Sequence, residues 1–218
     1  MSELSFTEEN YLKAIYHLSR NGSESVNTNS LAESMQTTPA SVNDMVKRLA
    51  QKNLIGYQKY KGTTLLPQGQ KVALMIVRKH RLWEVFLVDK LGFKWDEVHE
   101  IAEQLEHINS PMLIQRLDEF LGFPSIDPHG DPIPDEKGNM KESVKASISD
   151  VKIGSTGIMV AVHTDDSLLL QHLDSIGIKL GSRIQVMERI EFDGSVSLSV
   201  NNGPPQFISH TVAENLMI

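Results

Sequence analysis

An acidic stretch near the middle of the chain, residues 95–108, combines histidines and glutamates in a pattern that could bind a metal ion. Read as a helix at about 100° per residue, it places several of these side chains on one arc of about 100°. They are His99, Glu103, Glu106 and His107. Carboxylate oxygens and imidazole nitrogens that converge from one face suit a divalent transition-metal ion. A solvated acidic helix with two histidines is the alternative, and this stretch by itself leaves both interpretations open.

A second pair of ligand types precedes the acidic stretch. His80 and Glu84 are four residues apart, so on a helix they share a face. A lone pair of this kind is more often a surface hydrogen bond than a metal site. The metal-site interpretation is favoured here because the acidic stretch follows the pair directly.

Composition excludes several other kinds of chemistry. The 218 residues contain no cysteine, which excludes disulfides, zinc–thiolate sites and cysteine nucleophiles. No nucleophile–base arrangement and no glycine-rich phosphate loop stands out. No uninterrupted apolar run is long enough to cross a bilayer, and the N-terminus lacks the pattern of a secretory signal. We therefore expect a cytoplasmic protein without a membrane partner.

Charge is distributed unevenly along the chain, although the net charge is only −7. Residues 36–81 hold nine Lys/Arg and one acid, Asp44, which gives a net charge of +8. Residues 82–136 hold three Lys/Arg and thirteen Asp/Glu, which gives a net charge of −10. A basic block followed by an acidic block predicts one surface for a polyanion and another for cations.

The basic block has the pattern of a helix-turn-helix with a wing. Apolar spacing predicts helices over 7–19, 29–35 and 40–52, and Pro39 stands at a first helical position. A hairpin with a basic tip is expected over 54–66. Many small helical bundles share this spacing, but the wing and the positive charge favour binding to double-stranded DNA. The candidate DNA contacts are Thr37, Thr38, Pro39, Ser41, Asn43, Asp44, Lys47, Arg48, Lys59 and Lys61.

The remaining chain predicts a helical region and then a small β domain. A long helix over 67–91 is apolar on most of its sides, which predicts burial on more than one side and a homodimer interface. A helix over 112–121 and a proline-rich segment over 123–134 follow. From residue 147 short β-type runs indicate a small β-barrel. The fold is therefore mainly α with small β parts, and the expected domains are a winged-helix DNA-binding domain (1–66), a helical metal-binding and dimerisation domain (67–140) and the β domain (147–218).

Several motifs occur together and in order along the chain. They are Glu9–Tyr16 (ENYLKAIY), Ser41–Leu49 (SVNDMVKRL), Tyr57–Gly62 (YQKYKG), Arg78–Leu82 (RKHRL), Glu103–His107 (EQLEH) and Gly130–Pro134 (GDPIP). With these motifs the chain resembles the diphtheria toxin repressor and manganese transport regulator family of metal-dependent repressors over about residues 5–135. The C-terminal part resembles the SH3-like, FeoA-type module of the longer members.

The resemblance implies two metal sites. The primary site matches Glu103, Glu106, His107 and the position of Asn10, and the ancillary site matches His80, Glu84 and His99. The segment 162–166 is expected to contribute further ligands, for which His163 and Asp166 are the candidates.

The resemblance also bears on which ion is bound. Iron-type members carry cysteine where Glu103 stands, so this site resembles the manganese type and favours Mn²⁺, with Fe²⁺ as the alternative. Two positions depart from the manganese pattern. Asn10 is neutral where an aspartate is usual, and Lys13 stands where some manganese regulators have a carboxylate.

The function that the resemblance implies is repression of metal-uptake genes by a metal-loaded homodimer bound to a palindromic operator, with no enzymatic activity. The ion would join the first helix to the acidic helix and fix the spacing of two recognition helices. A winged-helix repressor of a small organic effector is an alternative, with Trp83 and Trp95 lining its pocket. A di-metal carboxylate enzyme is another, but it requires Glu-x-x-His pairs, and Gln104 occupies the position three before His107.

Overall fold

The computed structural model describes residues 4–58, 61–140 and 145–218, and the chain divides into two compact units. The first unit comprises Met1–His80, Gln104–Pro111 and Pro134–Met140, and the second comprises Arg81–Glu103, Met112–Ile133 and Lys141–Ile218. Within the described residues, no helix is both long and apolar enough to cross a membrane.

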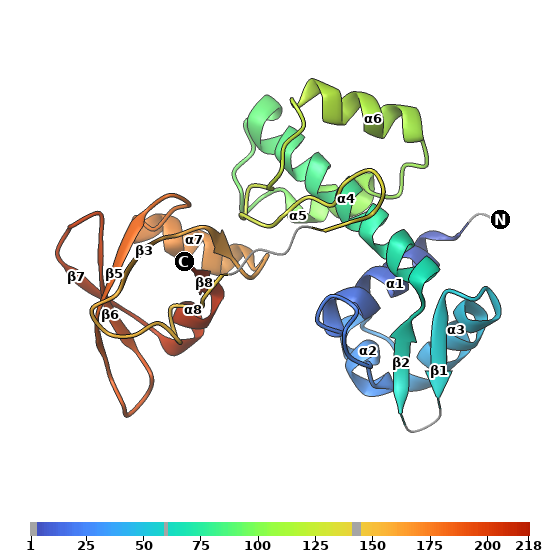
Figure 1. The fold of residues 1–218 in the computed structure, drawn as a ribbon, viewed down its shortest axis with the longest axis horizontal. Helices are drawn as coiled ribbons and strands as arrows, with labels where there is room; N and C mark the ends of the chain where they lie inside the picture. Colours follow the sequence, from blue (N-terminus) through green and yellow to red (C-terminus); the bar gives the residue numbers. More distant parts are fainter. Residues whose placement is uncertain (1–3, 59–60, 141–144) are drawn as a thin grey trace. The chain divides into compact units, whose positions relative to one another are not determined.

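Three helices and a hairpin open the first unit (Figure 1). They are α1 (Phe6–Leu18), α2 (Thr28–Ser34), α3 (Pro39–Gln51), β1 (Ile55–Gln58) and β2 (Gly62–Leu65). β1 and β2 pair antiparallel, with Ile55 opposite Leu65. This order of elements is that of a winged helix-turn-helix. Lys59, a predicted DNA contact in the wing, lies outside the described residues.

Local capping explains where these helices begin. Ser5 is the N-cap of α1 and forms a capping box with Glu8, so the helix begins at Phe6, one residue before the predicted start at residue 7. The Thr38 hydroxyl accepts a hydrogen bond from the Ser41 amide at the start of α3, and Pro39 is the first helical residue as predicted. The Thr38 cap fixes the first turn of α3, which carries several of the predicted DNA contacts.

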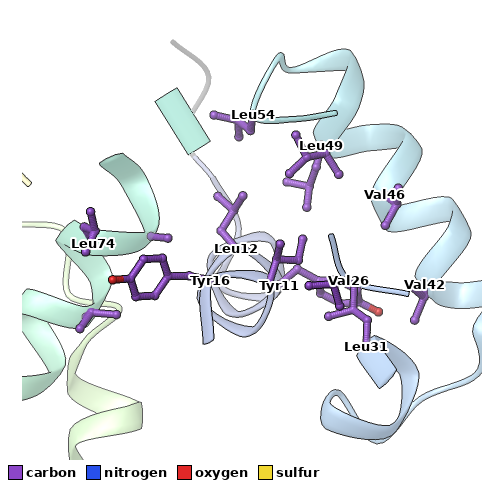
Figure 2. Packing of buried hydrophobic residues seen from close by; sticks show 14 of the residues in the cluster. Tyr11, Leu12, Tyr16, Val26, Leu31, Val42, Val46, Leu49, Leu54 and Leu74 are labelled. Atoms are coloured by element: carbon purple, nitrogen blue, oxygen red, sulfur yellow. The ribbon is translucent and has the colours of Figure 1, made fainter. Parts of the chain in front are cut away.

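The core of the first unit lies around α1. Figure 2 shows Leu12 pointing toward Leu49 and Leu54, whereas Tyr16 points the other way, toward Leu74 on α4 (Pro67–Leu91). Leu12 and Leu49 are fully buried. Helix α1 therefore packs on one side against α3 and on the other against α4.

The second unit contains the rest of α4, two short helices and the C-terminal β domain (Figure 1). The helices are α5 (His99–Leu105) and α6 (Pro111–Phe120). The β domain consists of β3 (Thr156–Ile158), β4 (Ala161–Val162), α7 (Ser167–Ser175), β5 (Arg183–Arg189), β6 (Val196–Val200), β7 (Pro205–Ile208), α8 (His210–Asn215) and β8 (Leu216–Met217). An antiparallel sheet runs in the order β3-β5-β6-β7, and β4 pairs with β8. Side chains of this sheet, α7 and α8 form a separate core.

The acidic helix is shorter than the sequence predicts. Residues before α5 form a turn in which the Glu97 carboxylate accepts a hydrogen bond from the Lys94 amide at 2.9 Å. Glu106 and His107 follow the last helical residue, Leu105. The predicted arc of ligands on one continuous helix is therefore wrong for Glu106 and His107.

Candidate metal centre

The first unit contains a cluster of charged side chains around Glu106, which is completely buried. Lys13 Nζ donates hydrogen bonds to both Glu106 oxygens, at 2.7 and 2.8 Å. His80 Nδ1 lies 2.7 Å from Glu106 Oε2. We call these three residues the lysine cluster. Its three residues come from α1, α4 and the turn after α5.

Positive charge around Glu106 compensates for its burial. Burial alone would raise the pKa of the Glu106 carboxyl, but the hydrogen bond from His80 and the charge of Lys13 outweigh it and hold the pKa below its ordinary value. A second lysine, Lys79, is half-buried near Glu9 and Glu106, and burial lowers its pKa. The carboxylate of Glu106 is therefore ionised and compensated by its neighbours.

His107 and Asn10 lie in the same unit as Glu106, and His107 Nε2 is 3.9 Å from Glu106 Oε1. His107 Nδ1 lies 2.6 Å from Glu9 Oε2, and the His107 ring stacks on Phe6 with centroids 4.7 Å apart. The Asn10 amide oxygen is buried without a hydrogen-bond partner among the described residues. Glu9, which the sequence did not single out, thus replaces Asn10 as the α1 partner of His107. The role of Glu106, His107 and Asn10 as metal ligands stays a prediction.

The second unit contains a different group, which we call the carboxylate–histidine cluster: Glu84, Asp127 and His129. Their side chains are 2%, 5% and 5% exposed respectively. One potential ligand atom from each lies within 4.8 Å of the others. His129 Nδ1 is 3.7 Å from Glu84 Oε2. Buried carboxylates and an imidazole that converge in this way match the donor set of a divalent metal site.

Backbone geometry of the proline-rich segment positions two of these ligands. Asp127 Oδ1 accepts hydrogen bonds from the His129 and Asp131 amides, both at 2.9 Å, so the segment turns tightly around this carboxylate. Gly130 has φ +88°, and a Cβ there would collide with the Val160 carbonyl. The segment 123–134, which the sequence predicts only as irregular, is therefore an ordered ligand loop.

Surrounding groups orient Asp127 and His129. Arg81 Nε pairs with Asp127 Oδ2 at 3.2 Å. His129 Nε2 donates to the Trp95 carbonyl at 2.9 Å, which leaves Nδ1 facing Glu84. An outer hydrogen bond that fixes the ring in this way is a common feature of metal-ligating histidines.

Two residues of the carboxylate–histidine cluster, Asp127 and His129, have raised pKa values. Burial, together with the charges of Glu84 and Asp131, raises the pKa of Asp127 to about 6 although Arg81 opposes this. Burial would lower the pKa of His129, but the Glu84 and Asp127 carboxylates raise it to about 9. At neutral pH the His129 imidazole is therefore protonated, and its positive charge offsets part of the negative charge of the neighbouring carboxylates.

His99 lies at the edge of this cluster. Its ring nitrogens are 3.1 Å from Asp165, 3.7 Å from Glu103 and 3.8 Å from Glu84. The C-terminal contact thus comes from Asp165, not from the predicted Asp166, whose side chain caps α7. The His163 side chain is exposed, and its amide donates to the Asn215 carbonyl.

Comparison with known proteins then decides the family. Three family models match consecutive parts of the chain: the N-terminal DNA-binding domain of iron-dependent repressors (residues 3–63), the metal-binding and dimerisation domain of iron-dependent repressors (66–135), and the FeoA domain (146–218). The iron-dependent repressor IdeR of Mycobacterium leprae is 30% identical over 85% of this chain and 86% of that protein. The chain belongs to the iron-dependent repressor family. It is therefore a metal-dependent, DNA-binding transcriptional repressor and not an enzyme.

Other relatives agree with this assignment. The diphtheria toxin repressor of Corynebacterium diphtheriae is 28% identical over 97% of this chain and 98% of that protein. A solved structure described as a manganese-dependent transcriptional repressor in complex with manganese is 35% identical, with 96% of this chain and 98% of that chain covered and a TM-score of 0.89. These matches confirm the predicted fold class: a winged helix-turn-helix, a helical dimerisation domain and an SH3-like FeoA domain.

Helix α3 of this repressor presents a polar face. Lys47 and Arg48 are exposed on α3, as is Lys61 in the turn between β1 and β2 of the wing. Thr38, Pro39, Ser41 and Asp44 are exposed too, whereas Thr37 and Asn43 are half-buried. Asp44 pairs with Lys47 at 3.4 Å. The predicted contacts are thus largely open to a DNA backbone.

Of the two tryptophans, Trp95 lines a pocket of the second unit together with Phe93 and Ile126. Trp83 is 8% exposed. Trp95 stacks on His129 with centroids 6.1 Å apart, and its Nε1 donates to Asp174 Oδ2 at 3.0 Å. Trp95 is thus a neighbour of the carboxylate–histidine cluster.

Sequence reasoning named Glu84, His80 and His99 as candidate ligands but did not name Asp127, His129 or Asp165. The signal was present in the run Asp127-Pro-His-Gly-Asp131, where ligand types alternate with turn formers. Without periodicity, the run gave no indication that it folds against α4.

A glutamine in place of Glu84 tests the electrostatics of the cluster. In the metal-free protein, Glu84→Gln is expected to lower the pKa of His129 from about 9, because burial remains while a neighbouring negative charge is lost. NMR titration of the histidine ring resonances measures this. Glu191→Gln, at an exposed position, is the control. A His129 pKa that stays near 9 in Glu84→Gln would contradict the described geometry.

Proposed function

We propose that this repressor senses Mn²⁺, with Fe²⁺ as the alternative, at Glu84, Asp127 and His129. The observation that carries the proposal is the convergence of these three buried side chains. Oxygen-rich ligation with one imidazole and no thiolate favours Mn²⁺ or Fe²⁺ over softer ions. Similarity to a manganese-dependent repressor in complex with manganese supports the choice.

His99 and Asp165 are proposed to complete or support this site. The His99 ring is 3.8 Å from Glu84 and 3.1 Å from Asp165. When bound, the ion supplies positive charge that the carboxylates of the cluster otherwise lack. His129 must then release its proton, since imidazole binds a metal in the neutral form. The affinity for the ion should therefore rise with pH up to about 9.

The DNA partner is proposed to be a palindromic operator bound by a homodimer. The family model that covers residues 66–135 describes a dimerisation domain. On and beside α6, Met112, Phe120 and Phe123 are more than half exposed, and such apolar side chains suit an interface with a second copy. Two copies related by a two-fold axis would place two α3 helices on equivalent half-sites. Lys47, Arg48 and Lys61 are the proposed phosphate and base contacts.

Metal binding and DNA binding are proposed to be coupled through α4. This helix begins two residues after β2 of the wing ends, and it carries Glu84 further along. An ion that binds one arrangement of the domains better than others shifts the population toward that arrangement. Coupling of this kind is typically about 1–3 kcal/mol.

The biological role follows from this coupling. We propose that the protein acts in the cytoplasm, where its operator lies, and switches off metal-uptake genes when the ion is abundant. Repression would then fall as the ion becomes scarce.

Operator binding with and without free metal tests the proposed function. DNA fragments are selected from a random library by the protein with Mn²⁺, and the affinity for them is then measured by gel shift with Mn²⁺ or with EDTA. Mn²⁺ is expected to raise the affinity roughly 5- to 150-fold. His129→Ala should retain the affinity seen in EDTA but lose the response to Mn²⁺. His210→Ala, at an exposed histidine, should respond like the wild type. Equal affinities in Mn²⁺ and EDTA would refute the proposal.

A single charge on the wing tests the DNA interface. Lys61→Ala is expected to weaken binding to all sequences alike and to reduce the slope of log K against log salt by about 1, because it removes one phosphate contact. Lys152→Ala removes an exposed lysine of the C-terminal domain and should leave the slope unchanged. An unchanged slope for Lys61→Ala would place the wing away from the DNA.

A further inference from the structure

The lysine cluster stands where the family resemblance puts an ion. We propose that the Lys13 ammonium replaces that ion in this chain. The repressor then carries its regulatory metal only at the carboxylate–histidine cluster. This inference rests on the proposed function, since it concerns which of two clusters a metal-dependent repressor uses.

Lys13 holds Glu106 in the way that a bound cation would. Its ammonium contacts both carboxylate oxygens, at 2.7 and 2.8 Å, and its side chain is 12% exposed. His80 occupies a further position on Oε2. A divalent ion ligated by Glu106 would have to displace this ammonium from a fully buried carboxylate.

The balance of charges around Glu106 also favours the Lys13 ammonium over a metal ion. Around Glu106, the negative charges of Glu9 and Glu106 face the positive charges of Lys13 and Lys79. These four groups sum to zero without a metal. Asn10, one turn before Lys13 on α1, adds no negative charge. An added divalent ion would leave the group with excess positive charge in a buried position, which is costly.

The carboxylate–histidine cluster has the opposite balance. In the described ion pairs around it, five carboxylates meet two permanent cations, Arg81 and Lys145. The carboxylates are Glu84, Glu103, Asp127, Asp131 and Asp165. The shortage of positive charge is therefore in the second unit.

The replacement has a structural consequence. Lys13 lies on α1 of the winged helix, and Glu106 lies in the turn after α5. Their ion pair connects these two segments whether or not metal is present. In this chain the Lys13–Glu106 ion pair thus replaces the connection that the family resemblance assigns to an ion. The concentration of metal then affects only the carboxylate–histidine cluster.

Metal content of matched variants tests the proposal. Each protein is equilibrated with Mn²⁺ by dialysis, and bound manganese per subunit is measured by mass spectrometry. Glu106→Gln is expected to bind as much Mn²⁺ as the wild type while its metal-free form melts at a lower temperature. Lys13→Gln frees the Glu106 carboxylate, whose Oε1 lies 3.9 Å from His107 Nε2, so it should bind roughly twice as much Mn²⁺. Lys13→Arg keeps the positive charge and should bind no more than the wild type.

The outcomes separate this inference from the proposed function. Loss of manganese in Glu106→Gln, or equal manganese in Lys13→Gln and the wild type, would overturn the replacement by Lys13. Glu84→Gln reports on the other cluster and should lose the wild-type ion. If Glu84→Gln retains its manganese, the proposed sensor site is wrong, and the comparison of Lys13→Gln with Lys13→Arg still decides the role of the ammonium.

Discussion

The burial of negative charge is the constraint on which the rest of this structure depends. Glu84, Glu106 and Asp127 lie in the protein interior, where an uncompensated carboxylate costs several kcal/mol. Glu106 is compensated by a lysine, and its pKa is lowered. Asp127 is not fully compensated, and its pKa rises to about 6. The negative charge of the lysine cluster is therefore neutralised by the protein's own side chains. The carboxylate–histidine cluster keeps an excess of negative charge that a bound cation would neutralise.

This division explains the charge pattern of the chain. The basic block of residues 36–81 supplies both the candidate DNA contacts and Lys79 of the first unit, while the acidic block of 82–136 supplies most of the candidate metal ligands. Helix α4 passes from one block to the other, since it starts beside the wing and carries Glu84. A repressor needs a surface for DNA phosphates and a site for a cation, and the sequence keeps these opposite charges in adjacent segments.

Periodicity and capping residues were enough to predict the winged helix, including Pro39 at the start of α3, because these signals are local. The ligand arc was wrong where it extended past Leu105, since helix ends depend on contacts that periodicity does not reveal. His80, Glu84 and His99 could be named because they lie on helices and match a family motif. Asp127 and His129 could not, because their segment has no repeating pattern. The partnership of Lys13 with Glu106 joins residues 93 positions apart, which no local pattern predicts.

X-ray diffraction from crystals of the Mn²⁺-loaded protein, recorded at the manganese absorption edge, tests this account most directly. Anomalous scattering locates the ion without reference to the surrounding side chains. The account predicts a peak among Glu84, Asp127 and His129, with the Lys13 ammonium still bound to both oxygens of Glu106. A peak between Glu106 and His107 with Lys13 turned away, and none at His129, would contradict it.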